Sequence, residues 1–333
     1  MSPTRHISRR TTRTSKYFPD KFQYAMKTQS INISKYLSRK QKKITHQEKR
    51  QPSESKLGID SSMAEVNRLH FNEEASTYDT KHSKLNERLT KEIQSRLDWI
   101  GVDWSIADDQ DDDDSDDDGD DSNEDEDEGS KNPVKESKNT QGKKEVRLLD
   151  YACGTGMMSR ALAPYTTQCV GIDVSENMVV AYNCRAENQG LSRDEMYAVV
   201  GDLIALDGPQ PSDVLADSRL FGFDVATVGG GLHHFADPEL AADRLVERLR
   251  PGGVLLVWDF LPHGPMSGHV GNHGVMHHGL SEERVRKMFE RAGAGQKFSL
   301  EVLGSGISID MGRHGEKGVI RREIFLARGQ KAV

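Results

Sequence analysis

The chain has 333 residues, a formal net charge of −8 and 35% hydrophobic residues, a composition that allows one or two globular domains. Two tracts carry most of the charge: residues 1–62 hold 15 Lys and Arg against 4 Asp and Glu, and residues 108–128 hold 16 acidic side chains in 21 positions. Without these tracts the net charge is −3. The rest of the chain therefore has no excess of positive charge that would indicate a nucleic-acid surface.

The cysteines and the apolar runs exclude two further classes of protein. Cys153, Cys169 and Cys184 have neither paired nor metal-type spacing, which argues against a disulfide framework and for a reducing compartment. No apolar run approaches the ~20 residues that cross a bilayer. We therefore expect no transmembrane segment and a cytoplasmic location.

Residues 1–62 are expected to form a disordered basic tail. The first 20 residues are rich in Arg, Ser and Thr, with Asp20 as the one acidic residue, which also fits a mitochondrial presequence. A third interpretation is an upstream extension of a protein whose functional start is Met63. The tail is favoured because the arginines have no apolar face opposite them, and a mitochondrial location is the alternative.

Two helices are predicted before the acidic tract. Residues 67–82 predict a short helix, and residues 84–100 predict a longer one with a single apolar stripe at steps of four, four, four and three, formed by Leu85, Leu89, Ile93, Leu97 and Ile100. Together they define a helical N-terminal segment over 63–106, which is either a lid or ordinary packing of a short helix.

Residues 107–145 are expected to be a disordered acidic linker, because such self-repelling blocks cannot bury enough apolar surface to fold. A long insertion is tolerable there, since the entropy of loop closure grows slowly with length. The tract is interpreted as a solvated spacer. Alternatively it binds a basic partner or the N-terminal tail, and Ser115 and Ser122 resemble acid-directed kinase sites.

From residue 146 to about 330, short apolar runs alternate with helical patterns, which is typical of a parallel sheet with crossover helices. Asp237, with Pro238 behind it, caps a helix that Pro251-Gly252-Gly253 should end, and Ser281 caps another that ends at Gly293. We predict an α/β, Rossmann-like domain with a mostly parallel seven-stranded sheet and an antiparallel C-terminal pair at one edge. The predicted strands are 146–150, 169–173, 196–200, 223–228, 254–259, 298–303 and 322–328.

The residues that follow each strand are the candidate site, because ligands of open α/β sheets bind beyond the carboxyl ends of the strands. Gly154 and Gly156 in the first turn allow a ligand close to the backbone. A dinucleotide site needs a third glycine where Ser159 stands, and a P-loop needs a Lys-Ser or Lys-Thr pair that is missing. Asp150 before the glycines favours instead a ligand with an amine or sulfonium.

Two more acidic residues extend this interpretation. Asp173 ends the second strand, and a carboxylate there can accept hydrogen bonds from both hydroxyls of a ribose. Asp202 ends the third strand, where it could accept a hydrogen bond from the exocyclic amine of adenine.

Four motifs in order, "LLDYACGTG", "GIDVSENMV", "VVGDL" and "FDVATVGGGLHHFADPE…LRPGGVLLVWDF", resemble those of class I S-adenosylmethionine-dependent methyltransferases. The resemblance covers roughly 146–330 and is to the small-molecule branch, type 11, with the ubiquinone- and menaquinone-biosynthesis methyltransferases. The segment "FNEEASTYDTKH", with Phe71, Ala75, Tyr78 and Asp79, is similar to the one that covers the cofactor in that branch.

This resemblance implies S-adenosyl-L-methionine as the cofactor and a small molecule as the methyl acceptor. It places Gly154 and Gly156 at the methionine portion, Asp173 at the ribose, Asp202 and Leu203 at the adenine, and Gly229 or Gly230 at the amino-acid end. It also implies cofactor contacts by Asp150, Ala152, Val174, Met178 and Tyr78. The family commonly has glycine where Ala152 stands, and we expect a negative φ there, which leaves binding intact.

His233 and His234 follow the fourth strand and are the candidate general bases, since imidazole can take a proton near neutral pH. The alternative is that they only shape the turn into the next helix. Methyl transfer is an in-line displacement, so alignment alone can suffice where the acceptor need not lose a proton.

Five more histidines lie in the loop after the fifth strand: His263, His269, His273, His277 and His278. Their spacing matches no metal pattern and no carboxylate or thiolate lies among them, so we expect no metal site but a loop over the substrate. His277 and His278 are the candidates for substrate contact.

The predicted function is therefore methyl transfer to a small molecule. The alternatives are a methyltransferase for protein or RNA, with the charged tracts as docking arms, and a cofactor-binding protein without turnover. "GGGL" stands after the fourth strand, where methyltransferases of amide and base nitrogens often carry an N-P-P-Y or D-P-P-Y type sequence.

Overall fold

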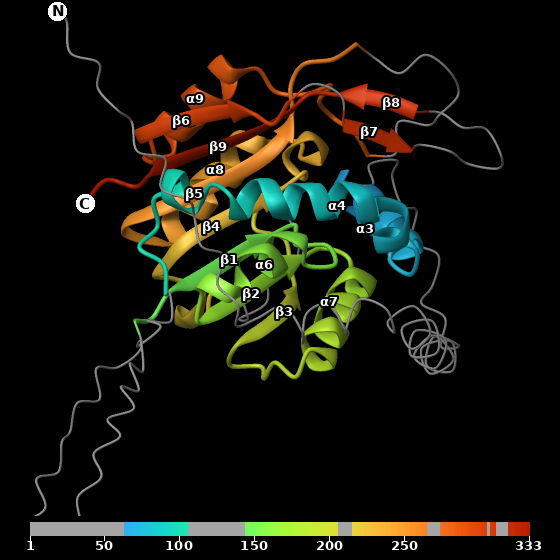
Figure 1. Cartoon of the computed structure of the whole chain (residues 1–333), viewed down its shortest axis with the longest axis horizontal. Coiled ribbons are helices and arrows are strands. Elements are labelled where there is room, and N and C mark those ends of the chain that lie inside the picture. Colours follow the sequence, from blue (N-terminus) through green and yellow to red (C-terminus); the bar gives the residue numbers. More distant parts are fainter. Residues whose placement is uncertain (1–62, 106–143, 206–214, 265–273, 305–306, 311–318) are drawn as a thin grey trace, which may run out of the picture.

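A computed structural model describes residues 63–105, 144–205, 215–264, 274–304, 307–310 and 319–333 (Figure 1). The predicted basic tail and nearly all of the acidic linker lie outside the described residues, as do Ser115, Ser122, His269 and His273. The domain boundaries and the cytoplasmic location therefore stay predictions. Within the described part, no helix combines the length and the apolar character needed to cross a membrane.

The main sheet has seven strands in the order β3-β2-β1-β4-β5-β9-β6. Strands β1 to β5 pair in parallel, whereas β9 runs antiparallel to both β5 and β6. The predicted α/β fold with an antiparallel pair at one edge is thus confirmed. The strands are β1 Arg147–Tyr151, β2 Gln168–Asp173, β3 Met196–Val200, β4 Phe223–Gly229, β5 Leu249–Phe260, β6 Gln296–Val302 and β9 Ile324–Gln330.

Helices cover both faces of this sheet, as successive side chains of a strand point to opposite faces. Leu148 belongs to a core formed with the helices α4 Tyr78–Gln94, α6 Met157–Leu162 and α7 Glu176–Asn188. Leu149 belongs to the opposite core, formed with α8 Pro238–Arg248 and α9 Glu282–Arg291. The seven-stranded sheet is therefore the middle of three layers.

The N-terminal helices differ in their bounds from the prediction. Helix α3 spans Met63–Glu74, α4 begins at Tyr78, and the short α5 spans Leu97–Ile100. The break falls at residues 75–77, where Ala75 is buried with 2% of its surface exposed. The predicted apolar stripe is real, because Leu89, Ile93 and Ile100 are completely buried against the sheet. The long helix thus belongs to the core, and α3 extends from it toward α7 (Figure 1).

Two details of the C-terminal half also differ from the prediction. Helix α8 ends at Arg248, and β5 starts at Leu249, so Pro251-Gly252-Gly253 lies inside the strand, where the pairing with β4 shifts register. Buried Leu249 pairs with Phe223 before this irregularity, which explains why the strand begins early. A second two-stranded sheet, β7 Ile307–Asp310 with β8 Val319–Arg322, was not predicted. The predicted caps are present: Asp237 accepts from Leu240 N and Ser281 from Arg284 N.

Candidate functional site

A cavity of about 430 Å³ opens at the carboxyl ends of β1 to β4, which is where an open α/β sheet binds its ligands. We call it the strand-end cavity. Strand ends and the turns after them form its floor, and helices α3 and α4 form its cover. Its lining residues are Met63, Ala64, Asn67, Phe71, Tyr78, Tyr151, Ala152, Gly154, Asp173, Val174, Met178, Asp202, Ile204, Ala205, Gly229, Gly230, Gly231, His234, Phe235 and Ala236.

The turn after β1 uses three left-handed residues, Ala152 with φ 51°, Gly154 with φ 52° and Gly156 with φ 88°. The predicted negative φ at Ala152 is therefore wrong. Cys153 N donates to Ile172 O of β2, so the left-handed conformation of Ala152 lets the chain make one more hydrogen bond to β2 before it turns. An added Cβ at Gly154 would meet no atom within 4 Å, which leaves this backbone open to a ligand.

Gly156 has a different role, since an added Cβ there would lie 2.8 Å from the Tyr182 ring. It does not line the strand-end cavity but allows α7 to pack against the turn. The contact of Gly156 with the ligand stays a prediction, whereas its positive φ and its packing against Tyr182 both require glycine.

Replacing Ala152 by glycine should stabilise the protein, because an alanine in the left-handed region costs about 1 kcal/mol that glycine avoids. We expect Ala152→Gly to raise the melting temperature by about 2–4 °C, as measured by thermal unfolding. The matched control is Ala161→Gly inside α6, which should lower the melting temperature. A lower melting temperature for Ala152→Gly would contradict the left-handed assignment.

Asp150 lies behind the turn and not in the cavity, which corrects its predicted contact with the ligand. Its carboxylate accepts hydrogen bonds from Ser159 N at 3.1 Å, Ser159 Oγ at 2.7 Å and Thr227 Oγ1 at 3.2 Å. Burial raises the pKa of Asp150 to about 7, and the bonds from Ser159 oppose that shift. Ser159, at the position of a third glycine, thus ties α6 to the end of β1.

Asp173 ends β2 with its carboxylate at the cavity wall. One oxygen accepts from Gly154 N at 2.8 Å and the other from Ser175 N at 2.8 Å, so two backbone groups fix its orientation. Burial raises the pKa of Asp173 to about 6 despite these bonds. Val174 and Met178 line the cavity beside it, where Ser175 caps α7 by accepting from Met178 N.

Asp202 follows β3 and lines the opposite part of the cavity. It accepts from the Tyr151 hydroxyl at 2.9 Å and from Ile204 N at 3.0 Å through the same oxygen. Leu203, predicted beside it, instead packs its side chain into the core and donates its N–H to Tyr151. Ile204 takes the place in the lining that Leu203 was expected to have.

Gly229 and Gly230 line the cavity at the end of β4. An added Cβ would lie 2.6 Å from Trp258 Nε1 at Gly229 and 2.3 Å from the Trp258 ring at Gly230. Any side chain at either position would collide with the Trp258 indole, so only glycine fits there. The part of both residues that lines the cavity is therefore backbone.

The cover is held to the floor by polar contacts that join α3 and α4 to α7 and the glycine turn. Glu176 accepts from Arg68 at 2.9 Å and from Asn72 at 2.8 Å. Asp79, in the first turn of α4, accepts from Thr155 Oγ1 at 2.5 Å and pairs with Arg185 Nη2 at 2.5 Å. These contacts place Tyr78 over the cavity, where burial raises the pKa of its hydroxyl.

The two candidate bases have different surroundings. His234 lines the cavity, and burial, with His233 beside it, lowers the pKa of His234 to about 3. His233 lies next to it with ring centroids 4.2 Å apart, and its Nδ1 is 2.8 Å from a carboxylate oxygen of Asp259. Asp259 is completely buried at the end of β5.

His277 and His278 do not line the strand-end cavity. The Nδ1 atom of His277 lies 3.2 Å from Arg284 Nη1, and His278 O accepts from His263 N at 2.9 Å. Their contact with an acceptor stays a prediction. Within the described part of the chain, no group of three or more His, Cys, Asp or Glu side chains is placed to hold a metal ion.

Sequence reasoning missed several residues of the site. Tyr151 lies inside a strand, where the strand-end rule does not apply. Asn67 on α3 donates through Nδ2 to the carbonyl of His234, and this contact spans 167 residues, so no local pattern could show it. Asp259 was not missed in this way, because the strand-end rule itself marks Asp259 and the residues after it.

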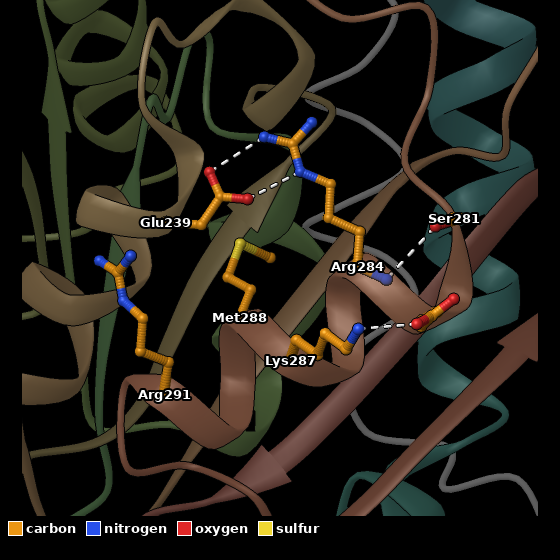
Figure 2. A pocket seen from close by; sticks show the side chains of 7 residues that line it. Glu239, Ser281, Arg284, Lys287, Met288 and Arg291 are labelled. Carbon is orange, nitrogen blue, oxygen red and sulfur yellow. Dashed lines mark hydrogen bonds and ion pairs between the residues drawn. The ribbon is translucent and has the colours of Figure 1, made fainter.

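A second hollow of about 350 Å³ lies between α8 and α9 (Figure 2). Its cations are already paired: Arg284 with Glu239 and Lys287 with Glu283, both at 2.7 Å, and Arg291 with Asp243. These pairs leave no uncompensated charge to attract a ligand, so the strand-end cavity is the candidate site.

A family model described as a methyltransferase domain matches residues 149–255. An uncharacterised methyltransferase of Schizosaccharomyces pombe is 32% identical over 157 residues, which cover 45% of this chain and 54% of the relative. A demethylmenaquinone methyltransferase of Thermus thermophilus is 34% identical, covering 38% and 51%. A ubiquinone biosynthesis O-methyltransferase of Idiomarina loihiensis is 28% identical, covering 37% and 47%.

The chain thus spans about half the length of the curated relatives that it matches. The matched segment contains the glycine turn, Asp173, Asp202 and the end of β4, which are the parts that build the floor of the cavity. The chain therefore carries a methyltransferase domain over residues 149–255.

Proposed function

We propose that the chain binds S-adenosyl-L-methionine in the strand-end cavity and transfers its methyl group to a small molecule. The observation that carries this proposal is the convergence of Asp173, Asp202 and the open turn at Gly154 on one cavity. A volume of about 430 Å³ lies within the range of small-molecule sites, roughly 300–1,000 Å³.

The side chains fit such a cofactor chemically. Asp173, oriented by two backbone N–H groups, retains lone pairs for the hydroxyls of a ribose. The other oxygen of Asp202 accepts no hydrogen bond from the described part of the chain and suits the exocyclic amine of an adenine. When bound, the cofactor supplies a methyl group activated by a sulfonium. The protein's part is to orient both reactants and to exclude water beneath α3 and α4.

A small acceptor is supported by the cover and by the relatives. Apolar side chains of α3, including Met63 and Phe71, form part of the cavity wall, which leaves little room for a polymer. Two of the relatives are named for menaquinone and ubiquinone biosynthesis.

Incubation of the full chain with methyl-labelled S-adenosylmethionine and whole-cell extract tests the acceptor class. We expect the label in small molecules. Label in protein or RNA that is lost on deletion of 1–62 or 108–128 would support the docking-arm alternative. Cofactor binding without any labelled product would support a protein without turnover.

The affinity for S-adenosylmethionine should fall in acid because the ionised form of Asp173 is the hydrogen-bond acceptor. Burial raises its pKa to about 6, so the carboxylate is ionised above that pH and protonated below it. We expect affinity about tenfold weaker at pH 5 than at pH 7, by calorimetry. The same titration with Asp173→Ala should be nearly flat, and a wild-type affinity that rises in acid contradicts this role.

A further inference from the structure

We propose that the methyl acceptor is an uncharged, largely apolar molecule, and that the side chains of α3 in the strand-end cavity select against charged ones. The inference rests on the proposed function and deepens it, because it gives the chemical class of the acceptor. It starts from the distribution of charge around the cavity.

The segments that follow the five parallel strands contain no lysine and no arginine. They are residues 152–156, 174–175, 201–217, 230–237 and 261–281. Lys and Arg make up 45 of the 333 residues, so this gap does not follow from the composition of the chain. Arg147 and Arg250 lie instead at the starts of β1 and β5, at the opposite edge of the sheet.

The side chains that line the cavity in the described part of the chain have the same imbalance of charge. They include the carboxylates of Asp173 and Asp202 but no lysine and no arginine. Burial raises the pKa of Asp173 to about 6, so this group is ionised at neutral pH. His234 adds no positive charge there, because burial lowers its pKa to about 3. The lining is therefore negative, with no cation to receive an anionic group.

The cation of α3 is already engaged by carboxylates. Arg68 is the single lysine or arginine of this helix. Its guanidinium lies 2.7 Å from a carboxylate oxygen of Glu65 and 2.9 Å from one of Glu176. An anionic acceptor would have to break one of these pairs to gain a counter-charge from the cover.

A bound cofactor does not reverse this balance. The sulfonium and the ammonium of S-adenosylmethionine exceed its carboxylate by one positive charge, whereas Asp173 and Asp202 bring two carboxylates. An anion would therefore lose its water without gaining a cation of the protein, which is costly. A cationic acceptor would find both carboxylates assigned to the cofactor. An uncharged acceptor meets neither cost.

Four side chains of α3 line the cavity, and we call them the α3 wall: Met63, Ala64, Asn67 and Phe71. Positions 63, 67 and 71 recur every four residues and so share one face of the helix. The Phe71 ring meets the His234 ring edge to face, with the centroids 5.3 Å apart. Asn67 turns its amide toward the protein, since Nδ2 donates to His234 O at 3.0 Å and Oδ1 lies against Gly274. The α3 wall thus presents mainly apolar surface, which rejects a charged molecule.

Met63→Arg tests the α3 wall by adding the charge that it lacks. Arginine stays ionised when buried, and its side chain is unbranched like that of methionine. Met63→Gln is also unbranched but carries no charge, so it separates the effect of charge from that of shape. Leu69→Arg is the matched control, because Leu69 belongs to the same helix, is 52% exposed and lies outside the lining.

The experiment uses the full chain, saturating methyl-labelled S-adenosylmethionine and the small molecules of a whole-cell extract. Ion exchangers at neutral pH first separate these molecules into acids, amines and uncharged compounds, because methylation itself can change the charge of an acceptor. Each fraction is then offered separately, and calorimetry checks that each variant still binds the cofactor.

For the wild type, Met63→Gln and Leu69→Arg, we expect at least about tenfold more label in the uncharged fraction than in either charged fraction. For Met63→Arg we expect transfer to uncharged compounds to fall at least about tenfold, because its guanidinium needs water or a counter-charge in the cavity. The share of label in the acids should rise in the same variant. Should Met63→Arg lose the cofactor, the wild-type distribution decides the acceptor class.

Wild-type protein that binds no S-adenosylmethionine, or that labels none of the three fractions, would contradict the proposed function itself. The inference is overturned separately if the wild type methylates small molecules mainly among the acids or the amines. It is equally overturned if Met63→Arg binds the cofactor and keeps the wild-type distribution of label, since charge in the α3 wall would then not govern the choice of acceptor.

Discussion

Asp173→Ala should weaken S-adenosylmethionine binding by at least about 100-fold, the largest effect on binding that we expect from a single substitution. Hydrogen bonds to a charged group contribute about 1.5–3 kcal/mol each, and the ribose offers two hydroxyls. The substitution also leaves Gly154 N and Ser175 N without their acceptor, which loosens the glycine turn. Calorimetry measures the affinity directly.

Asp150→Asn is the matched control for this prediction. Asp150 ends the neighbouring strand, but its carboxylate is bonded to Ser159 and Thr227 behind the turn. Burial raises its pKa to about 7, so an uncharged amide resembles the protonated form that burial favours. We expect the Asp150→Asn variant to bind S-adenosylmethionine with an affinity within about threefold of the wild-type value. Equal losses at both positions would show that only the shape of the turn matters, not the carboxylate of Asp173.

Asp79→Ala should destabilise the protein by about 3–5 kcal/mol, because it leaves the guanidinium of Arg185 buried without its counter-charge. Only 6% of the Arg185 side chain is exposed, and burial lowers its pKa. The substitution also removes the bond from Thr155, so the start of α4 loses its attachment to the glycine turn. S-adenosylmethionine should dissociate faster as a consequence.

Denaturant unfolding measures the loss of stability, and stopped-flow displacement measures the rate of dissociation. Glu87→Ala is the control on the exposed face of the same helix, where Glu87 pairs with Lys91 in solvent. Its free energy of unfolding should stay within about 0.5 kcal/mol of wild type. If Asp79→Ala behaves like this control, the contact between Asp79 and Arg185 does not hold the cover.

The fold was predictable because each strand of the parallel sheet is an apolar run with an aspartate or a glycine at its last residue or directly beside it. Asp173, Asp202 and Gly229 could be found as site residues by this rule alone, and the structure brings them to one cavity. The rule says nothing about the direction of a side chain. Asp150 therefore appeared equivalent to Asp173, although alternation along β1 turns it toward Ser159 and the core.

Other features depend on contacts that no local pattern records. The positive φ of Ala152 follows from the need to keep Cys153 on the ladder with β2, not from the alanine itself. The break between α3 and α4 falls where Ala75 becomes buried, inside a run that reads as helical on both sides. The contact between His233 and Asp259 joins residues 26 apart, on two different strand ends.

The measurement that tests the account most directly is calorimetric titration of the full chain with S-adenosyl-L-methionine at neutral pH. We predict one site per chain, with an affinity that Asp173→Ala weakens by at least about 100-fold and Asp150→Asn leaves nearly unchanged. Absence of binding by the wild-type protein, or binding that is insensitive to Asp173→Ala, would contradict the assignment of the strand-end cavity as the cofactor site.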